Sequence, residues 1–205
     1  MRLQTASHKL AAVLAAASFF LLVETAQAQP KPTMVQRFAL CTTCHGVGGV
    51  STQPLIPSLA GQPSFYAITQ LFLFREGRRD SEAMTAVAKN MTDDDLRAFS
   101  DYIGTLPPPP ARAPDTADAL RMARGAARAQ QHRCASCHGA DFAGGKQVAR
   151  LAYQREDYLR QTLLQFSTAK RIGYTQAMNE ALAGISPDAL LDLAHYLAHL
   201  PKAAP

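Results

Sequence analysis

The chain has little cysteine, and all of it is concentrated in two places. The 205 residues include four cysteines, which stand as two C-x-x-C pairs, Cys41 with Cys44 and Cys134 with Cys137. No free cysteine remains to serve as an additional metal ligand. Any cysteine chemistry of the protein must therefore take place within these two pairs.

Long hydrophobic runs and clustered positive charge are also missing from most of the chain. After residue 28 no segment has the length and apolarity of a membrane-spanning helix. The formal net charge is +5, but the arginines are scattered and form no stripe with interleaved aromatic residues. We therefore expect no nucleic-acid partner.

Residues 1–28 have the pattern of an export signal. Arg2 and Lys9 make a positive start, residues 10–23 form a short apolar run, and Ala26-Gln27-Ala28 is a small-x-small cleavage signature. We predict cleavage after about Ala28. The alternative is a retained membrane anchor, but the run is shorter than the roughly 20 apolar residues that a spanning helix needs.

Each cysteine pair is followed directly by a histidine. The two motifs are Cys41-Thr42-Thr43-Cys44-His45 and Cys134-Ala135-Ser136-Cys137-His138. Two thiols at this spacing can form thioethers with the two vinyl groups of one porphyrin, while the adjacent imidazole meets the iron. The motifs therefore predict two covalently attached haem c groups.

Other interpretations of the cysteine pairs are two short disulfides, a redox-active site and a zinc site. Neither a disulfide nor a redox-active pair requires a histidine directly after the second cysteine, twice. Zinc ribbons usually place two C-x-x-C units closer together in the sequence than these are. Haem attachment explains the motifs best.

The motifs belong to a longer internal repeat. Six landmarks of the first half recur in the second half at a nearly constant offset of about 92 to 94 residues. They are Cys41 and Cys134, Leu59 and Leu151, Tyr66 and Tyr158, Phe74 and Phe166, Met84 and Met178, and Tyr102 and Tyr196. The change in offset places a two-residue insertion between Arg171 and Met178. The chain therefore contains two copies of one small domain.

A run of prolines separates the copies. Residues 107–114 read PPPPARAP, a composition that favours an extended, semi-rigid spacer over a helix. We assign residues 29–106 to an N-terminal domain, residues 107–114 to the linker and residues 115–205 to a C-terminal domain. Domains of this size have a marginal apolar core, to which a covalently fixed haem would contribute.

Both copies are expected to be helical, because no stretch alternates polar and apolar residues over a useful length. We predict helices over about 34–40, 63–74 and 92–106 in the first copy and over about 116–132, 155–166 and 186–200 in the second. Thr92 followed by three aspartates matches an N-terminal cap, which explains this acidic run better than a metal or partner site.

The sixth iron position decides whether a haem transfers electrons or activates small molecules. Met84 and Met178 occupy equivalent repeat positions, in predicted loops ahead of the last helix of each copy. Thioether sulfur suits haem iron and raises its potential, so we predict His45 with Met84 and His138 with Met178 as the axial pairs. We interpret Met34, Met91 and Met122 as residues that fill gaps in the core.

His195 and His199 are weaker candidates for metal binding. They lie four residues apart on a predicted helix, a spacing that can hold a metal, but no third ligand is evident in the sequence. We interpret them as part of a solvated helix face.

With these motifs the sequence resembles the cytochrome c4 family. The similarity rests on the duplicated haem motif, the segment Ile56-Pro57-Ser58-Leu59-Ala60-Gly61-Gln62, the residues Tyr66, Gln70, Leu71 and Phe74, Met84, and the helix with Leu96 and Tyr102. The resemblance implies a periplasmic all-α protein with two tandem class I cytochrome c-like domains related by a pseudo-twofold. It further implies two His/Met haems that deliver electrons from respiratory donors to a terminal oxidase, and a Pro57 carbonyl that orients the ligating histidine.

The second copy departs from the family pattern. It reads Val148-Ala149-Arg150-Leu151-Ala152-Tyr153-Gln154 at the equivalent place, without the proline. The carbonyl of Ala149 can still accept the hydrogen bond of the histidine, but from a less rigid backbone. We therefore expect the two haems to differ in potential.

These features favour an electron carrier that is not itself an enzyme. Its expected partners are redox proteins, namely an electron donor and a terminal oxidase or dehydrogenase, with peripheral association with membrane complexes. The alternative is a cytochrome subunit of a dehydrogenase complex such as a flavocytochrome c sulfide dehydrogenase. A dihaem peroxidase or thiosulfate-oxidising enzyme would need an open or unusually ligated iron, whereas both sixth positions here have a methionine available.

Overall fold

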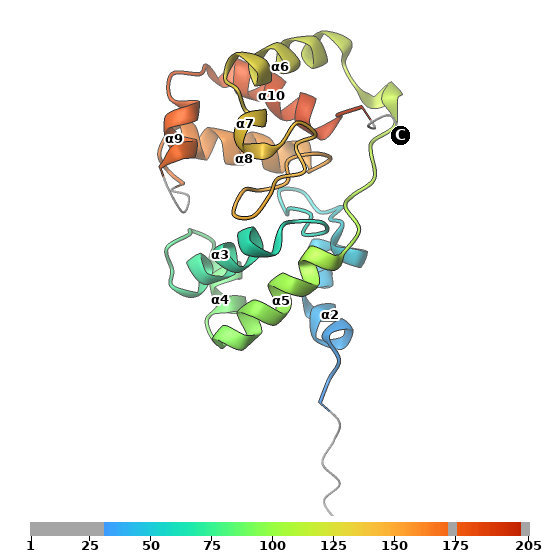
Figure 1. The fold of residues 1–205 in the computed structure, drawn as a ribbon, viewed down its shortest axis with the longest axis vertical. Helices are drawn as coiled ribbons and strands as arrows, with labels where there is room; N and C mark the ends of the chain where they lie inside the picture. The colour runs from blue at the N-terminus through green and yellow to red at the C-terminus, as the bar shows by residue number, and fades with distance from the viewer. Residues whose placement is uncertain (1–30, 172–175, 202–205) are drawn as a thin grey trace, which may run out of the picture. The chain divides into compact units, whose positions relative to one another are not determined.

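The secondary structure is helical, as the sequence predicts. The computed structural model describes residues 31–171 and 176–201, and within them it contains no strand beyond an isolated bridge between Gly145 and Val148. The chain from Thr33 onward forms one compact unit (Figure 1). The predicted export signal lies outside the described residues. No helix of the described part is both long and apolar enough to cross a membrane.

The first repeat is built from four α-helices. They are α2 (Met34–His45), α3 (Ser64–Arg75), α4 (Glu82–Ala88) and α5 (Asp93–Thr105), with a short 3₁₀ turn over Val47–Gly49. Helix α3 packs against α4 and α5, and α2 contacts α5 (Figure 1). The main apolar cluster of this repeat has four buried members, Phe38, Ala67, Phe99 and Ile103.

The second repeat follows the same plan with a larger core. After a 3₁₀ turn over Pro114–Thr116 come α6 (Ala119–Gln131), α7 (Ala135–His138), α8 (Glu156–Ser167), α9 (Ala177–Leu182) and α10 (Pro187–Ala198). Helix α10 packs against α6 and α8, and α9 packs against α8. The apolar cluster has 13 buried residues, among which Leu190, Leu193 and Leu197 of α10 are almost fully enclosed.

The predicted caps form at the last helix of each repeat. The Thr92 hydroxyl accepts from the amide of Asp95, and the Asp95 carboxylate accepts from the amide of Thr92, which completes a capping box. The Ser186 hydroxyl caps α10 by accepting from the amide of Ala189, with Pro187 in the first turn. The acidic run after Thr92 therefore serves the helix end, and Asp95 also pairs with Arg37 of α2.

The loops predicted around the two repeated methionines are short helices instead. Met84 lies in α4 and Met178 in α9. Helix α4 is capped by Ser81, whose hydroxyl accepts from the amide of Met84. Helices of six or seven residues are too short to show a periodic apolar stripe, which is why the sequence pattern did not reveal them. The predicted insertion between Arg171 and Met178 falls mainly on residues 172–175, outside the described residues.

The proline-rich segment is extended, and it also packs against the first repeat. Residues 107–113 form no helix, and Pro109 is buried. Pro108 lies so close to Gly61 that a side chain at that glycine would come within 2.9 Å of the proline Cα. Gly61 also has a φ of +68°, a conformation that favours glycine.

Candidate haem sites

Each C-x-x-C-H motif lies at the end of a helix. Cys41, Cys44 and His45 form the last turn of α2, and the equivalent residues of the second repeat lie on and just before α7. Residues three apart on a helix share a face, so the two thiols of each motif can reach one group. The glycine that follows each motif, Gly46 or Gly139, has a positive φ. A Cβ atom at Gly46 would lie 2.0 Å from the Val50 carbonyl oxygen and collide with it.

The thiols have the properties needed for attachment. All four cysteines are free, with Cys41 and Cys134 half-buried and Cys44 and Cys137 exposed. Burial raises the pKa of the Cys41 and Cys134 thiols. Each motif therefore offers two unpaired thiols for thioether formation.

Both motif histidines are oriented by a backbone carbonyl. His45 Nδ1 lies 2.8 Å from the carbonyl oxygen of Pro57, and His138 Nδ1 lies 2.9 Å from that of Ala149. Because a carbonyl can only accept, Nδ1 must carry the proton, and Nε2 keeps its lone pair for a metal. The loss of the proline in the second repeat leaves this hydrogen bond in place.

Burial keeps the two imidazoles neutral. His45 and His138 are each only 6% exposed, and this burial lowers the pKa of both rings, although the carbonyl contacts oppose the shift. Neutral imidazole is the form that ligates iron. Two free thiols and one available Nε2 in each motif therefore fit a covalently attached haem.

The predicted sixth ligands, Met84 and Met178, are both half-buried, and Met178 packs against the core of the second repeat. Met34 and Met91 pack against the core cluster of the first repeat, in agreement with a gap-filling role. Ligation by Met84 and Met178 stays a prediction.

A crossed arrangement of arginine and tyrosine joins the two repeats. Arg79 donates to the Tyr158 hydroxyl at 2.9 Å, and Arg171 donates to the Tyr66 hydroxyl at 3.4 Å. Burial alone would raise the pKa of Tyr158, but the two guanidiniums outweigh it and lower that pKa to about 7. Neither arginine belongs to a haem motif, although Arg79 and Arg171 are separated by the repeat offset just as Tyr66 and Tyr158 are.

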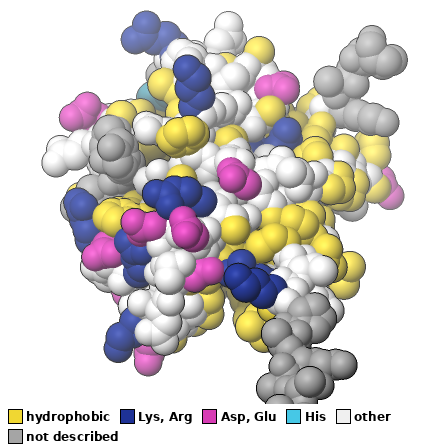
Figure 2. Space-filling view, turned by 60° about the horizontal axis from the view of Figure 1, so that its bottom comes forward, with side chains coloured by type: hydrophobic (Ala, Val, Ile, Leu, Met, Phe, Trp, Pro, Cys, Tyr) yellow, Lys and Arg dark blue, Asp and Glu magenta, His cyan; other side chains and the backbone are white. Residues whose placement is uncertain are grey.

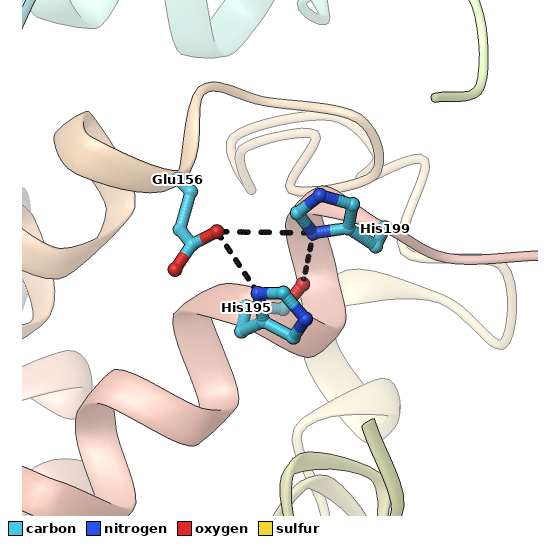
Figure 3. Close-up of side chains that lie close together, drawn as sticks. All are labelled: Glu156, His195 and His199. Carbon is cyan, nitrogen blue, oxygen red and sulfur yellow. Dashed lines mark hydrogen bonds and ion pairs between the residues drawn. The ribbon is translucent and has the colours of Figure 1, made fainter. Parts of the chain in front are cut away.

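The two histidines at the C-terminal end of α10, His195 and the C-cap residue His199, have a different role from the predicted solvated face. His195 is buried, and its Nδ1 lies 2.9 Å from a carboxylate oxygen of Glu156 on α8 (Figure 3). His199 Nδ1 lies 3.8 Å from the same oxygen. Glu156 is thus the third potential ligand that the sequence could not reveal, and the donor atoms of the three residues lie within 4.8 Å of one another.

The hydrogen bonds of His195 nevertheless define a structural cluster. Its Nε2 accepts from the amide of Asp118 at 2.9 Å, so Nδ1 carries the proton and donates to Glu156. A metal at Nδ1 would need that nitrogen deprotonated. The proton of the neutral ring would then be on Nε2, where it would face the N–H of Asp118, so that two donors would point at each other. Arg121 also places its guanidinium 3.0 Å from Glu156 and repels a cation. The cluster fastens the start of α6 to α8 and α10.

Removing the charge of Glu156 should weaken this cluster in a pH-dependent way. Burial alone would raise the pKa of Glu156, but contacts with His195 and Arg121 lower it overall. The ionised carboxylate therefore contributes stability above the unfolded-state pKa and loses it as the pH falls through the lower folded-state value. Glu156→Gln should reduce the free energy of unfolding by about 1–2 kcal/mol at pH 7.

Guanidinium denaturation of the haem-loaded protein at pH 7 and near pH 3 measures this effect. The difference from wild type should shrink as the pH falls through the lowered folded-state pKa of Glu156, because the carboxylate then loses its charge in the folded state as well. Asp101→Asn is the matched control, because Asp101 is exposed and stands at the repeat position of His195. An equal loss for both variants would contradict the assignment.

Family models agree with this description of the two sites. The model described as "Cytochrome C oxidase, cbb3-type, subunit III" matches residues 29–103, and the model described as "Cytochrome c" matches residues 122–201. Together with the duplicated motif, they define the chain as a c-type cytochrome with two covalently attached haem c groups.

Individual relatives narrow the assignment. The cytochrome c4 of Thiocapsa roseopersicina is 33% identical over 174 residues, covering 80% of this chain and 88% of the relative. The solved cytochrome c4 of Acidithiobacillus ferrooxidans matches with a TM-score of 0.69 and 28% identity, over 79% of this chain and 99% of that chain. The chain belongs to the cytochrome c4 family and is a dihaem electron-transfer protein.

The prediction that the chain is not an enzyme is wrong as stated. A thiosulfate dehydrogenase electron acceptor of Thiomonas intermedia (strain K12) is 31% identical over 143 residues, which cover 66% of each chain. A solved thiosulfate dehydrogenase (TsdBA) of Marichromatium purpuratum matches with 32% identity and a TM-score of 0.67, over 77% of this chain and 36% of that chain. The chain is therefore related to part of an enzyme as well as to cytochrome c4 proteins.

Proposed function

We propose that the chain carries single electrons between redox proteins in the periplasm, with iron ligated by His45 and Met84 in the first repeat and by His138 and Met178 in the second. The observation that carries the proposal is the hydrogen bond from each histidine Nδ1 to a backbone carbonyl, which leaves Nε2 available as a ligand. The export pattern over residues 1–28 supports the location.

The residues of the chain have separate tasks in this function. The cysteine thiols hold the cofactor covalently, and the histidines and methionines set the electron affinity of the iron. When bound, each haem supplies one reversible one-electron couple. Enclosure of both histidines keeps water away from their rings and so limits reorganisation on oxidation.

A second candidate is an electron acceptor that docks on a dehydrogenase. Its support comes from the relatives named above and from exposed apolar side chains. Of the eight large exposed apolar side chains in the described part of the chain, seven lie in the first repeat. They are Val35, Leu40, Val47, Leu55, Phe65, Phe72 and Val87. Figure 2 shows hydrophobic side chains reaching the surface beside both acidic and basic ones, a mixture typical of transient protein interfaces.

A redox titration of the purified holoprotein, followed by its visible spectrum, tests the proposal. We expect two one-electron centres per chain and, in the oxidised protein, the sulfur-to-iron absorption band of His/Met ligation. Binding of carbon monoxide by the undamaged reduced protein would contradict it. Copurification with a dehydrogenase, with electron transfer from its substrate, would favour the second candidate.

A further inference from the structure

Two glutamines form matching hydrogen-bond pairs across the repeats. The Gln154 side chain accepts from the amide of Ser58 at 2.8 Å and donates to the carbonyl of Ser58 at 2.9 Å. The Gln62 side chain makes the same pair with the backbone of Arg150, at 3.0 Å for both bonds. Gln62 is 7% exposed and Gln154 is 4% exposed, so both pairs are shielded from water.

The amides held by these glutamines belong to the peptide groups that orient the haem ligands. The carbonyl of Pro57 and the amide of Ser58 are two ends of one peptide group, and so are the carbonyl of Ala149 and the amide of Arg150. A peptide group is planar, so fixing the direction of its N–H fixes the direction of its C=O. One chain of hydrogen bonds therefore runs from Gln154 through the Pro57 peptide to His45, and another runs from Gln62 through the Ala149 peptide to His138.

We infer that each glutamine is a positioning residue for the haem ligand of the other repeat: Gln154 for His45 and Gln62 for His138. The inference rests on the proposed function, because it takes these histidines as iron ligands. An amide that donates to a glutamine polarises its peptide group, which makes the carbonyl at the other end a stronger acceptor. A stronger acceptor at Nδ1 makes the imidazole a better electron donor, which favours ferric iron and lowers the potential.

The two glutamines should differ in the size of their effect. Pro57 has a φ fixed by its ring, whereas Ala149 depends on its neighbours for a fixed conformation. Gln154 also accepts from the amide of Arg155 at 2.9 Å, at the start of α8, while the equivalent residue after Gln62 is Pro63, which has no amide proton. Gln62 therefore has the larger effect on its target and the simpler set of contacts.

The test uses Gln62→Met and Gln62→Glu in the full dihaem protein. Methionine keeps the volume but loses both hydrogen bonds, so the potential of the second haem should rise and its ratio of ferrous to ferric iron should increase several-fold at a fixed ambient potential. Ionised glutamate accepts more strongly from the Arg150 amide, so that haem's potential should fall. A purely structural role of Gln62 would not move the potential of the second haem while leaving that of the first haem, in its own repeat, unchanged.

The readouts are potentiometric titration and the proton NMR spectrum of the ferric protein, with haem methyl signals assigned through residues flanking Cys41 or Cys134. Gln154→Met should shift the first haem and leave the second unchanged. Gln165→Met is the control, because among the described residues the Gln165 side chain makes no hydrogen bond to the first repeat. Three results would overturn the inference: a shift only in the haem of the mutated repeat, equal shifts of both haems, or no shift of either haem.

The wild-type spectrum separates this inference from the proposed function. If the oxidised wild type lacks the sulfur-to-iron band or shows fewer than two irons per chain, the proposed function fails. If both are present and the glutamine variants retain two haems and wild-type helix content without shifting the other haem, the inference alone fails.

Discussion

Replacing Met84 by alanine should abolish the sulfur-to-iron absorption of the first haem and lower its reduction potential by on the order of a hundred millivolts, a fraction of the roughly 0.8 V that axial ligation can span. Thioether sulfur stabilises ferrous iron, so its loss favours the ferric state. Met178→Ala should do the same to the second haem. Spectropotentiometric titration of each variant resolves the two centres and shows which one has moved.

Met91→Ala is the control for both methionine variants. Met91 packs against the core cluster of the first repeat, so its side chain has a packing role. Its backbone carbonyl accepts from Arg75, a hydrogen bond that the alanine variant keeps. Both haems should keep their absorption and potentials in this variant. If Met91→Ala removed the sulfur band, the assignment of Met84 would be wrong.

Removing both cysteines of one motif should have the largest effect on the fold. Cys41→Ala combined with Cys44→Ala should leave one covalent haem per chain, and so should Cys134→Ala combined with Cys137→Ala. Removal of Cys41 and Cys44 should lower the helix content more than removal of Cys134 and Cys137. The main apolar cluster of the first repeat has four buried residues, whereas that of the second has 13. A small core depends more on a covalently fixed group for its stability.

Haem content per chain and far-UV circular dichroism measure these outcomes. Thr43→Ala and Ser136→Ala are the controls, because both side chains are exposed and lie between the cysteines of their motifs. Both controls should retain two haems and full helix content. An equal loss of helix from the two double variants would contradict the proposed difference between the repeats.

Much of the fold was accessible from local patterns. Thr92 and Ser186 predicted the starts of α5 and α10, because a capping hydroxyl and the amide it accepts from lie three residues apart. The short helices α4 and α9 were missed for the opposite reason, since six or seven residues carry too little periodicity. The prediction that His195 lies on a solvated face was wrong, because the carboxylate that accepts from its ring belongs to Glu156 on another helix.

The sequence by itself determined that two haems are attached and where, because a thiol, a second thiol and an imidazole within five residues are brought together by a single helical turn. Only the tertiary structure decided which residues hold the hydrogen-bond partners of those ligands in place. The peptide that orients His45 is held by Gln154, 96 residues away from Ser58, and the partner of His195 lies 39 residues away. Contacts at such separations depend on how helices pack, and hydrophobic packing is set by the whole set of buried side chains rather than by any local pattern.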